Sequence, residues 1–203
     1  RLRRAGGGIE TSVRKGPFHP RSFMRIEGGL YVSTPEMAFC EMASVLSLER
    51  LIALGFELCG TYRRASTFGL ARYDATLLTS PGALASFIEK SPQFKGVKKA
   101  RRALPLILAG SASPRESELA MLLCLPYSLG GYGLPHPTMN AEMPLPKNVA
   151  ATGRSSLRCD LYWPAARLDV EYDSAEFHSA ERLLANDSMR RMALESMDVT
   201  SVN

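Results

Sequence analysis

The stretch CDLYWPAARLDVEYDSAEFH, residues 159–178, decides the fold of the second half of this chain. Short runs rich in aromatic and aliphatic residues lie at 158–163 and at 168–172, which is typical of β-strands. The segment PAAR between them, residues 164–167, is typical of a turn. The sequence therefore predicts a β-hairpin at this place.

The segments on either side of the hairpin extend it into a sheet. Upstream, a capping-box pattern predicts a helix over 114–125, and 138–145 has the pattern of a strand. Downstream, residues 179–197 have apolar residues at helical spacing, and 199–202 would start another strand. The order helix, strand, strand, strand, helix, strand indicates an α/β fold.

The first half of the chain is predicted to be helical. Residues 1–28 are basic and rich in Gly and Pro, which is typical of a tail or linker. Beyond them, a hydroxyl residue followed by Pro or by an acid repeatedly signals a helix start. These signals predict a helix from Pro35, a helix from Leu48 to about Gly60, a third over 81–90 and a fourth over 95–108. We therefore expect a helical region at 29–110 and an α/β domain at 111–203.

Charge divides the chain at the same point. Residues 1–110 hold 17 basic and 8 acidic side chains, a net charge of +9, whereas residues 111–203 hold 8 basic and 12 acidic ones, a net charge of −4. A basic part suits the neutralisation of phosphates, and an acidic part suits metal binding or acid–base chemistry. Charge also fluctuates between domains without any function, so the division alone leaves both interpretations open.

Composition excludes several classes of protein. The chain is 45% hydrophobic and 22% charged, as in ordinary soluble domains, and its apolar runs are far shorter than the ~20 residues that span a bilayer. None of its four cysteines forms a CxxC pair, and no secretory signal is present. We therefore expect a cytoplasmic protein with reduced thiols and no membrane association. The chain begins with Arg1, and its last predicted strand is cut at Asn203, which indicates a C-terminally truncated fragment of a longer protein.

Acidic residues gather around the predicted hairpin. Asp160 lies on its first strand, and Glu171 and Asp173 lie two apart on the second, so those two share a face. His178 follows at the start of the next predicted helix. Carboxylates that converge with an imidazole suit a hard divalent cation such as Mg²⁺ or Mn²⁺. Acids at solvated strand ends need no metal, however, so the spacing leaves both interpretations open.

The run at 159–178 also resembles a bacterial endonuclease-like domain. That domain is related to the very-short-patch-repair mismatch endonucleases and belongs to the PD-(D/E)xK nuclease superfamily. The resemblance rests on an Asp before Trp-Pro, a Val-Glu-x-Asp strand, a following His, the Asp187-x-x-Arg190 step and the Ser113-Pro-x-Glu116 helix start. It covers about residues 111–203 and implies a mixed sheet flanked by helices.

The resemblance implies a role for each residue of the candidate site. Asp160 and Glu171 would bind Mg²⁺ or Mn²⁺, and Glu116 would supply a further acid from the first helix. His178 would lie near the scissile phosphate, and Arg190 would replace a missing lysine from the last helix. Glu116 is also explained as a capping-box acid, and His178 as a helix-start histidine without a partner.

One position departs from the superfamily pattern. Asp173 stands where the lysine after Glu-x is expected, and an aspartate cannot stabilise phosphate charge as a lysine does. More weakly, the first half resembles the helical part of abortive-infection type antitoxin-like regulators, on the run at 28–36 and the helix at 98–104. The departure and the second resemblance are the arguments for an alternative, a catalytically degenerate regulator.

A basic cluster is the candidate DNA-binding surface. It comprises Lys95, Lys98, Lys99, Arg101 and Arg102. Such a run grips phosphates or simply forms a solvated helix face. Three hypotheses follow: a Mg²⁺-dependent DNA endonuclease, which we favour, a DNA-binding regulator or antitoxin without cleavage, and an interaction module. The sequence leaves the oligomeric state open, a homodimer included.

Overall fold

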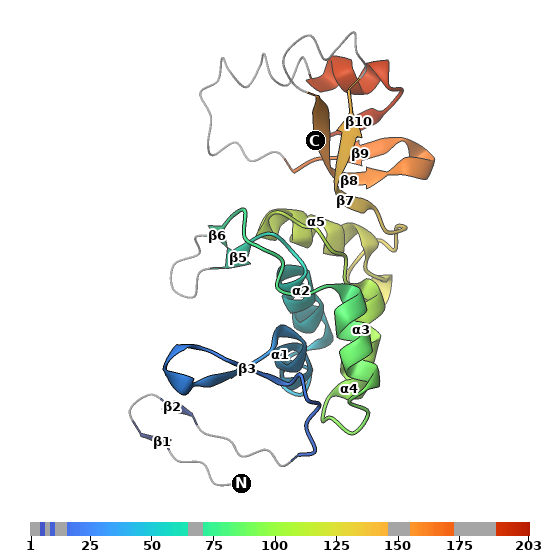
Figure 1. Cartoon of the computed structure of the whole chain (residues 1–203). Helices are drawn as coiled ribbons and strands as arrows, with labels where there is room; N and C mark the ends of the chain where they lie inside the picture. Colours follow the sequence, from blue (N-terminus) through green and yellow to red (C-terminus); the bar gives the residue numbers. More distant parts are fainter. Residues whose placement is uncertain (1–4, 7–8, 11–15, 65–70, 146–154, 173–189) are drawn as a thin grey trace.

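The computed structural model describes residues 5–6, 9–10, 16–64, 71–145, 155–172 and 190–203. The described chain has a mixed α/β architecture (Figure 1). A helical part comes first, and a four-stranded sheet follows it. The α/β class expected from the order of the predicted elements is confirmed.

The helical part contains four of the α-helices. They are α1 (Pro35–Met42), α2 (Leu48–Leu58), α3 (Pro81–Glu89) and α4 (Val97–Ala103). The hydroxyls of Thr34, Ser47 and Ser80 each accept a hydrogen bond from a backbone N–H three residues later, which satisfies a donor at the helix start. These caps explain why the predicted starts of α1, α2 and α3 are confirmed. In the described part of the chain, every helix falls short of the length and apolar character that a bilayer crossing requires.

The fourth helix is shorter than the sequence pattern predicts. The pattern indicates a helix over 95–108, whereas α4 covers Val97–Ala103 and a 3₁₀ turn continues over Leu104–Leu106. Pro105 lies in that turn and has no N–H to donate, so the α-helix cannot continue through it. At the other end Gly96 has a φ of 97°, which a helix does not allow.

The helical part also contains short pairs of antiparallel strands. β3 (Phe23–Arg25) pairs with β4 (Tyr31–Ser33), so part of the segment expected to be a tail belongs to a hairpin. Two smaller pairs join β1 to β2 and β5 to β6, and their bounds are β1 Ala5–Gly6, β2 Ile9–Glu10, β5 Arg63–Arg64 and β6 Ala71–Arg72. None of these pairs reaches the sheet of the second half among the described residues.

The second half begins with a helix and continues as a mixed sheet. Its elements are α5 (Pro114–Cys124), β7 (Thr138–Pro144), β8 (Ser156–Trp163), β9 (Leu168–Val170) and β10 (Thr200–Val202). The strand order is β10-β9-β8-β7, with β10 parallel to β9 and the other neighbours antiparallel. Residues 190–196 are helical and lead into β10. The predicted hairpin is confirmed, although β9 ends two residues before the predicted strand.

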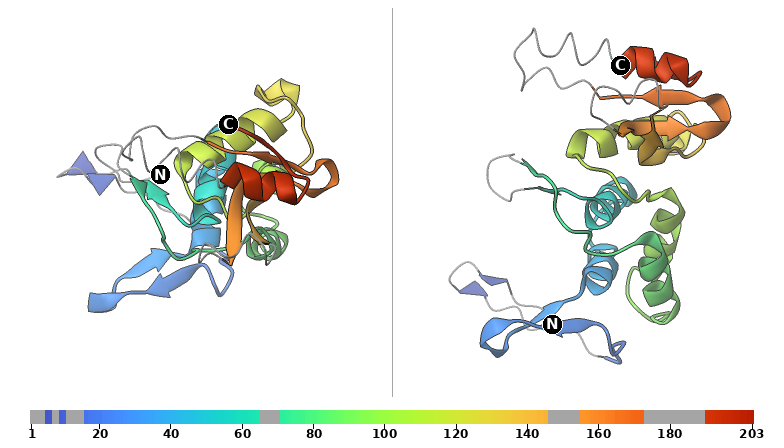
Figure 2. Two further views of the ribbon diagram at one scale, coloured as in Figure 1. Left: turned by 90° about the horizontal axis from the view of Figure 1, so that it is seen from above. Right: turned by 45° about the horizontal axis from the view of Figure 1, so that its top comes forward.

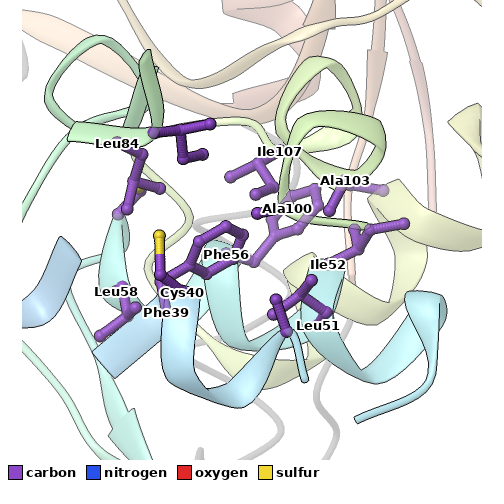
Figure 3. Close-up of a cluster of buried hydrophobic side chains, with 14 of the residues drawn as sticks. Phe39, Cys40, Leu51, Ile52, Phe56, Leu58, Leu84, Ala100, Ala103 and Ile107 are labelled. Atoms are coloured by element: carbon purple, nitrogen blue, oxygen red, sulfur yellow. The ribbon is translucent and has the colours of Figure 1, made fainter. Parts of the chain in front are cut away.

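One hydrophobic core runs through both halves. It includes Phe39, Leu51 and Phe56 of the helical part (Figure 3) and also Leu161 and Trp163 of β8. In Figure 1 and the right-hand view of Figure 2, α5 lies between the sheet and the helices of the first half. The packing is therefore continuous across the junction expected at residue 110.

The four cysteines are free and buried, as the apolar sequence around them predicts. Burial raises the pKa of each thiol well above its ordinary value, to about 12 for Cys40, Cys59 and Cys159 and to about 11 for Cys124. Thiols of this kind stay protonated near neutral pH and are poor nucleophiles. The cysteines are therefore part of the packing.

Candidate functional site

Asp160 lies near the end of the β8–β9 hairpin. Leu161 pairs with Val170, so one step further along the antiparallel register Asp160 lies opposite Glu171. The Asp160 Oδ2 atom accepts a hydrogen bond of 3.2 Å from the backbone N–H of Tyr172. The hairpin thus brings together the two residues that the resemblance implies as metal ligands.

The carboxyl group of Asp160 is unusually basic. Its pKa is raised to about 6, mainly by burial and secondly by the negative charge of Glu116. The Tyr172 N–H and the charge of Arg190 oppose this rise, and Asp169 adds a small contribution in the same direction as Glu116. Asp160 is therefore the group whose charge changes just below neutral pH, which is a common property of functional sites.

Glu116 reaches this region from the first turn of α5. Its backbone N–H donates to the Ser113 hydroxyl at 3.0 Å, and its Oε2 atom accepts from the Ala112 N–H at 2.8 Å. The same Oε2 atom accepts from the side-chain amide of Asn140 at 2.6 Å. Glu116 is only 7% exposed. The role of Glu116 at the helix start is thus confirmed, and its charge also acts on Asp160, whereas its role as a further acid of the site stays a prediction.

A second group of charges surrounds Arg190. Its guanidinium forms an ion pair with Glu171 and a longer one, of 3.5 Å, with Asp169. It also donates to the backbone carbonyl of Arg158 at 2.7 Å. Asp169 is completely buried, and burial raises its pKa, whereas Cys159 and Arg190 oppose that rise. Arg190 therefore reaches the carboxylates from the last helix, as expected, and it neutralises Glu171.

The carboxylates partly fit a divalent cation. Mg²⁺ in proteins is usually held by one or two carboxylates, with water and substrate phosphate as its other ligands, and Glu116 with Asp160 supplies such a pair. Within the described ranges, no group of three or more His, Cys, Asp or Glu residues is placed to hold a metal ion. Glu171 is engaged by Arg190 instead. Asp173 and His178 lie outside the described residues.

Two residues of this region were missed by the sequence analysis. Asn140 on β7 has a φ of 49°, which is rare within a strand, and its side chain holds Glu116. Asp169 has the sequence context of an ordinary strand residue, yet it is buried against Arg190. An Asn within a strand pattern is a weak signal for Asn140, and nothing local distinguishes Asp169 from a solvated acid.

The basic cluster on α4 lies apart from Asp160. In Figure 1, α4 lies at the lower end of the helical part, and the sheet lies beyond α5 at the opposite end. Lys99 donates from Nζ to the carbonyl of Leu46 at 2.5 Å, so this lysine supports the fold. The other four basic residues of the cluster, Lys95, Lys98, Arg101 and Arg102, are exposed. The structure therefore leaves the cluster available for phosphates without joining it to the carboxylates.

Comparisons with known proteins find two relatives in Mycobacterium tuberculosis. They are the uncharacterized proteins MT2308, of strain CDC 1551 / Oshkosh, and Rv2248, of strain ATCC 25618 / H37Rv. Each is 30% identical to this chain over 108 residues, which cover 53% of this chain and 35% of the relative. No family model matches the chain, and no solved structure matches it. The chain is thus similar to about a third of the length of these curated relatives.

Proposed function

We propose that this chain is a metal-dependent, endonuclease-like protein that hydrolyses phosphodiester bonds in DNA. The observation that carries the proposal is the pair formed by buried Glu116 and half-buried Asp160. Among the described residues neither carboxylate has an ion-pair partner, and their mutual repulsion contributes to the raised pKa of Asp160. Repulsion of this kind destabilises the fold, and a bound cation relieves it.

Further features support a domain of the PD-(D/E)xK type. The second half has a mixed sheet with α5 and the helix at 190–196 beside it, which is the kind of architecture that the resemblance implies. Asp160 lies on β8 and Glu171 directly follows the neighbouring strand β9, close to where acids of such a site are expected to lie. Arg190, at the start of the last helix, forms an ion pair with Glu171 and so supplies positive charge beside one of the acids, which is the role that the resemblance implies for it.

The residues of the chain have distinct tasks in this proposal. A bound Mg²⁺ would supply Lewis acidity and lower the pKa of a water molecule. Glu116 and Asp160 would hold the cation, and with a pKa of about 6 the Asp160 carboxyl is mostly ionised at neutral pH. The Tyr172 N–H fixes one oxygen of Asp160 and thereby orients its carboxylate.

Plasmid nicking in the presence of Mg²⁺ or Mn²⁺ tests the proposal. We expect nicking by the wild-type chain and a loss of at least about 100-fold in Asp160→Asn and Glu116→Gln, since both remove a charge that holds the cation. Glu118→Gln is the matched control, because Glu118 lies on the same helix but is about half exposed and pairs with Arg115. Equal activity of the wild type and all three variants would assign the cleavage to a contaminant.

A second candidate function is DNA binding without cleavage, by a regulator with a degenerate nuclease-like domain. The ion pair between Arg190 and Glu171 favours it, because it occupies one of the expected metal ligands. This function predicts DNA binding that weakens with salt and does not require Mg²⁺.

The α4 cluster provides the test of the second candidate. The triple variant Lys98→Ala, Arg101→Ala, Arg102→Ala should weaken binding to every DNA sequence, and each lost phosphate contact should reduce the slope of log K against log salt by about 0.9. The control is Arg50→Ala, Arg72→Ala, Lys90→Ala, which removes the same charge from exposed positions outside the cluster. An identical loss of DNA affinity in both triple variants would show that the cluster contributes only through the net charge of the chain.

A further inference from the structure

Asn140 links the helix that carries Glu116 to the strand beside Asp160. We propose that Asn140 is a positioning residue, an inference that rests on the proposed function. Asn140 holds the Glu116 carboxylate beside Asp160, so that these two carboxylates together bind a divalent cation. The residue acts through Glu116 and does not itself touch a substrate.

The contacts of the Asn140 side chain are the first evidence. Its Nδ2 atom donates to Glu116 Oε2 at 2.6 Å and to the backbone carbonyl of Gly110 at 2.9 Å. Both hydrogens of the amide are thus used, one on the carboxylate and one on the segment that precedes α5. This arrangement fixes the direction of the amide relative to Glu116.

The position of Asn140 in the sheet is the second piece of evidence. The pairs Met139–Leu161 and Ala141–Cys159 flank it, so Asn140 lies directly across from Asp160 in the register of β7 and β8. Its φ of 49° interrupts the extended backbone at that one position of the strand. Asn tolerates this left-handed conformation better than most residues and also has an amide to donate, so it meets both requirements of the position.

The chemistry of the hydrogen bond between Asn140 and Glu116 is the third piece of evidence. The Ala112 N–H also holds Glu116 Oε2, but Ala112 precedes α5 and does not belong to the sheet. Among the described residues, the side chain of Asn140 provides the hydrogen bond between Glu116 and the strand paired with β8. An amide orients a carboxylate without neutralising it, whereas Arg190 neutralises Glu171. Asn140 therefore keeps the full charge of Glu116 available for a cation.

The test measures Mn²⁺ affinity by electron paramagnetic resonance on the full chain, with urea unfolding in parallel. Asn140→Gly keeps the positive φ and removes the amide, and we expect Mn²⁺ affinity to fall by about 10-fold or more, as when an outer-shell partner of a metal ligand is lost. Arg167→Gly is the control, because Arg167 also has a positive φ, of 48°, in the turn between β8 and β9 and makes its ion pair with Asp198. We expect its Mn²⁺ affinity to be unchanged.

A double-mutant cycle separates positioning from simple support of the fold. If Asn140 acts through Glu116, Asn140→Gly should have almost no further effect on Mn²⁺ affinity in a Glu116→Gln background. Additive losses, unchanged affinity in Asn140→Gly, or a wild-type chain that binds no Mn²⁺ at millimolar concentration would each overturn the inference. DNA nicking tests the proposed function separately. If the Mn²⁺ affinities change as expected but the wild-type chain does not cleave DNA, the proposed function is wrong and the role of Asn140 stands. If the chain cleaves DNA but the losses of Mn²⁺ affinity are additive, the role of Asn140 is wrong and the proposed function stands.

Discussion

The carboxylates around the β8–β9 hairpin are held in two different ways. Glu171 and Asp169 share the guanidinium of Arg190, so their charge is compensated. Glu116 is held by neutral N–H groups, those of Ala112 and Asn140, and its charge acts on its neighbour Asp160. The first arrangement stabilises the fold once it is formed. The second costs stability and keeps negative charge in place, which is what a cation-binding site requires.

The largest effect is expected from removing the compensating cation. Arg190→Met leaves Asp169, which is completely buried, and Glu171 without their ion-pair partner. Breaking a buried pair from one side typically costs about 3–5 kcal/mol, and we expect a loss toward the lower end of that range because the side chains of Arg190 and Glu171 are 27% and 17% exposed. Urea unfolding at pH 7 measures the loss.

Arg167→Met is the comparison for this change. The ion pair between Arg167 and Asp198 belongs to side chains that are 59% and 85% exposed, so its loss should cost no more than about 1 kcal/mol. If the two variants lose the same stability, Arg190 does not compensate buried charge, and the contrast between the two groups of carboxylates disappears.

A smaller effect, of the opposite sign, is expected at Asp160. Asp160→Asn keeps an oxygen for the Tyr172 N–H and removes the charge that Glu116 repels. We expect the variant to be more stable than the wild type above pH 6, by on the order of 1–2 kcal/mol after solvent screening. Chemical unfolding at pH 7.5 checks the gain, and a variant less stable than the wild type would contradict it.

The dependence of stability on pH is a second measurement of the effect of the Asp160 charge. The pKa of Asp160 is about 6 in the folded chain against 3.8 for an ordinary Asp, so the folded state binds more protons between these values. Stability should therefore decrease as pH rises from about 4 to about 6, and this contribution should level off above that range. Asp160→Asn should lack this part of the profile.

The smallest effect on stability is expected at Glu116. Glu116→Gln keeps a side-chain oxygen for Ala112 and Asn140 and loses the charge at the start of α5, which is worth about 0.3–1 kcal/mol. The variant also loses the repulsion with Asp160, so the two contributions offset each other. The pKa of Asp160 should fall toward its ordinary value, because the second largest cause of its rise is removed. Carbon-detected NMR titration of Asp160 measures the shift, and an unchanged pKa would show that burial alone sets it.

Local features of this fold could be predicted from sequence. The helix starts at Pro35, Leu48, Pro81 and Pro114 follow from a hydroxyl residue directly before each of them, because a cap is formed within one turn. The hairpin around 164–167 follows from the turn between two apolar runs. Each of these signals involves residues that are close in sequence.

The contacts of the candidate site depend on residues far apart in sequence. Asp160 could be selected as an acid at a hairpin, but its neighbour Glu116 comes from 44 positions earlier, and their proximity depends on how α5 packs on the sheet. Arg190 was expected beside the acids only because of the resemblance. Arg190 neutralises Glu171 and reaches buried Asp169 because of where its helix lies. No local sequence pattern encodes that placement.

The position of α5 has a consequence for how the site is maintained. Its first turn carries Glu116, while Ala120 and Cys124 further along belong to the core that the helices share with β8. Opening the carboxylate pair by moving α5 would thus disturb the packing of both halves. We expect the amide hydrogen of Leu161 to exchange with solvent only when the whole chain unfolds cooperatively, so that the geometry of the site persists for as long as the protein stays folded.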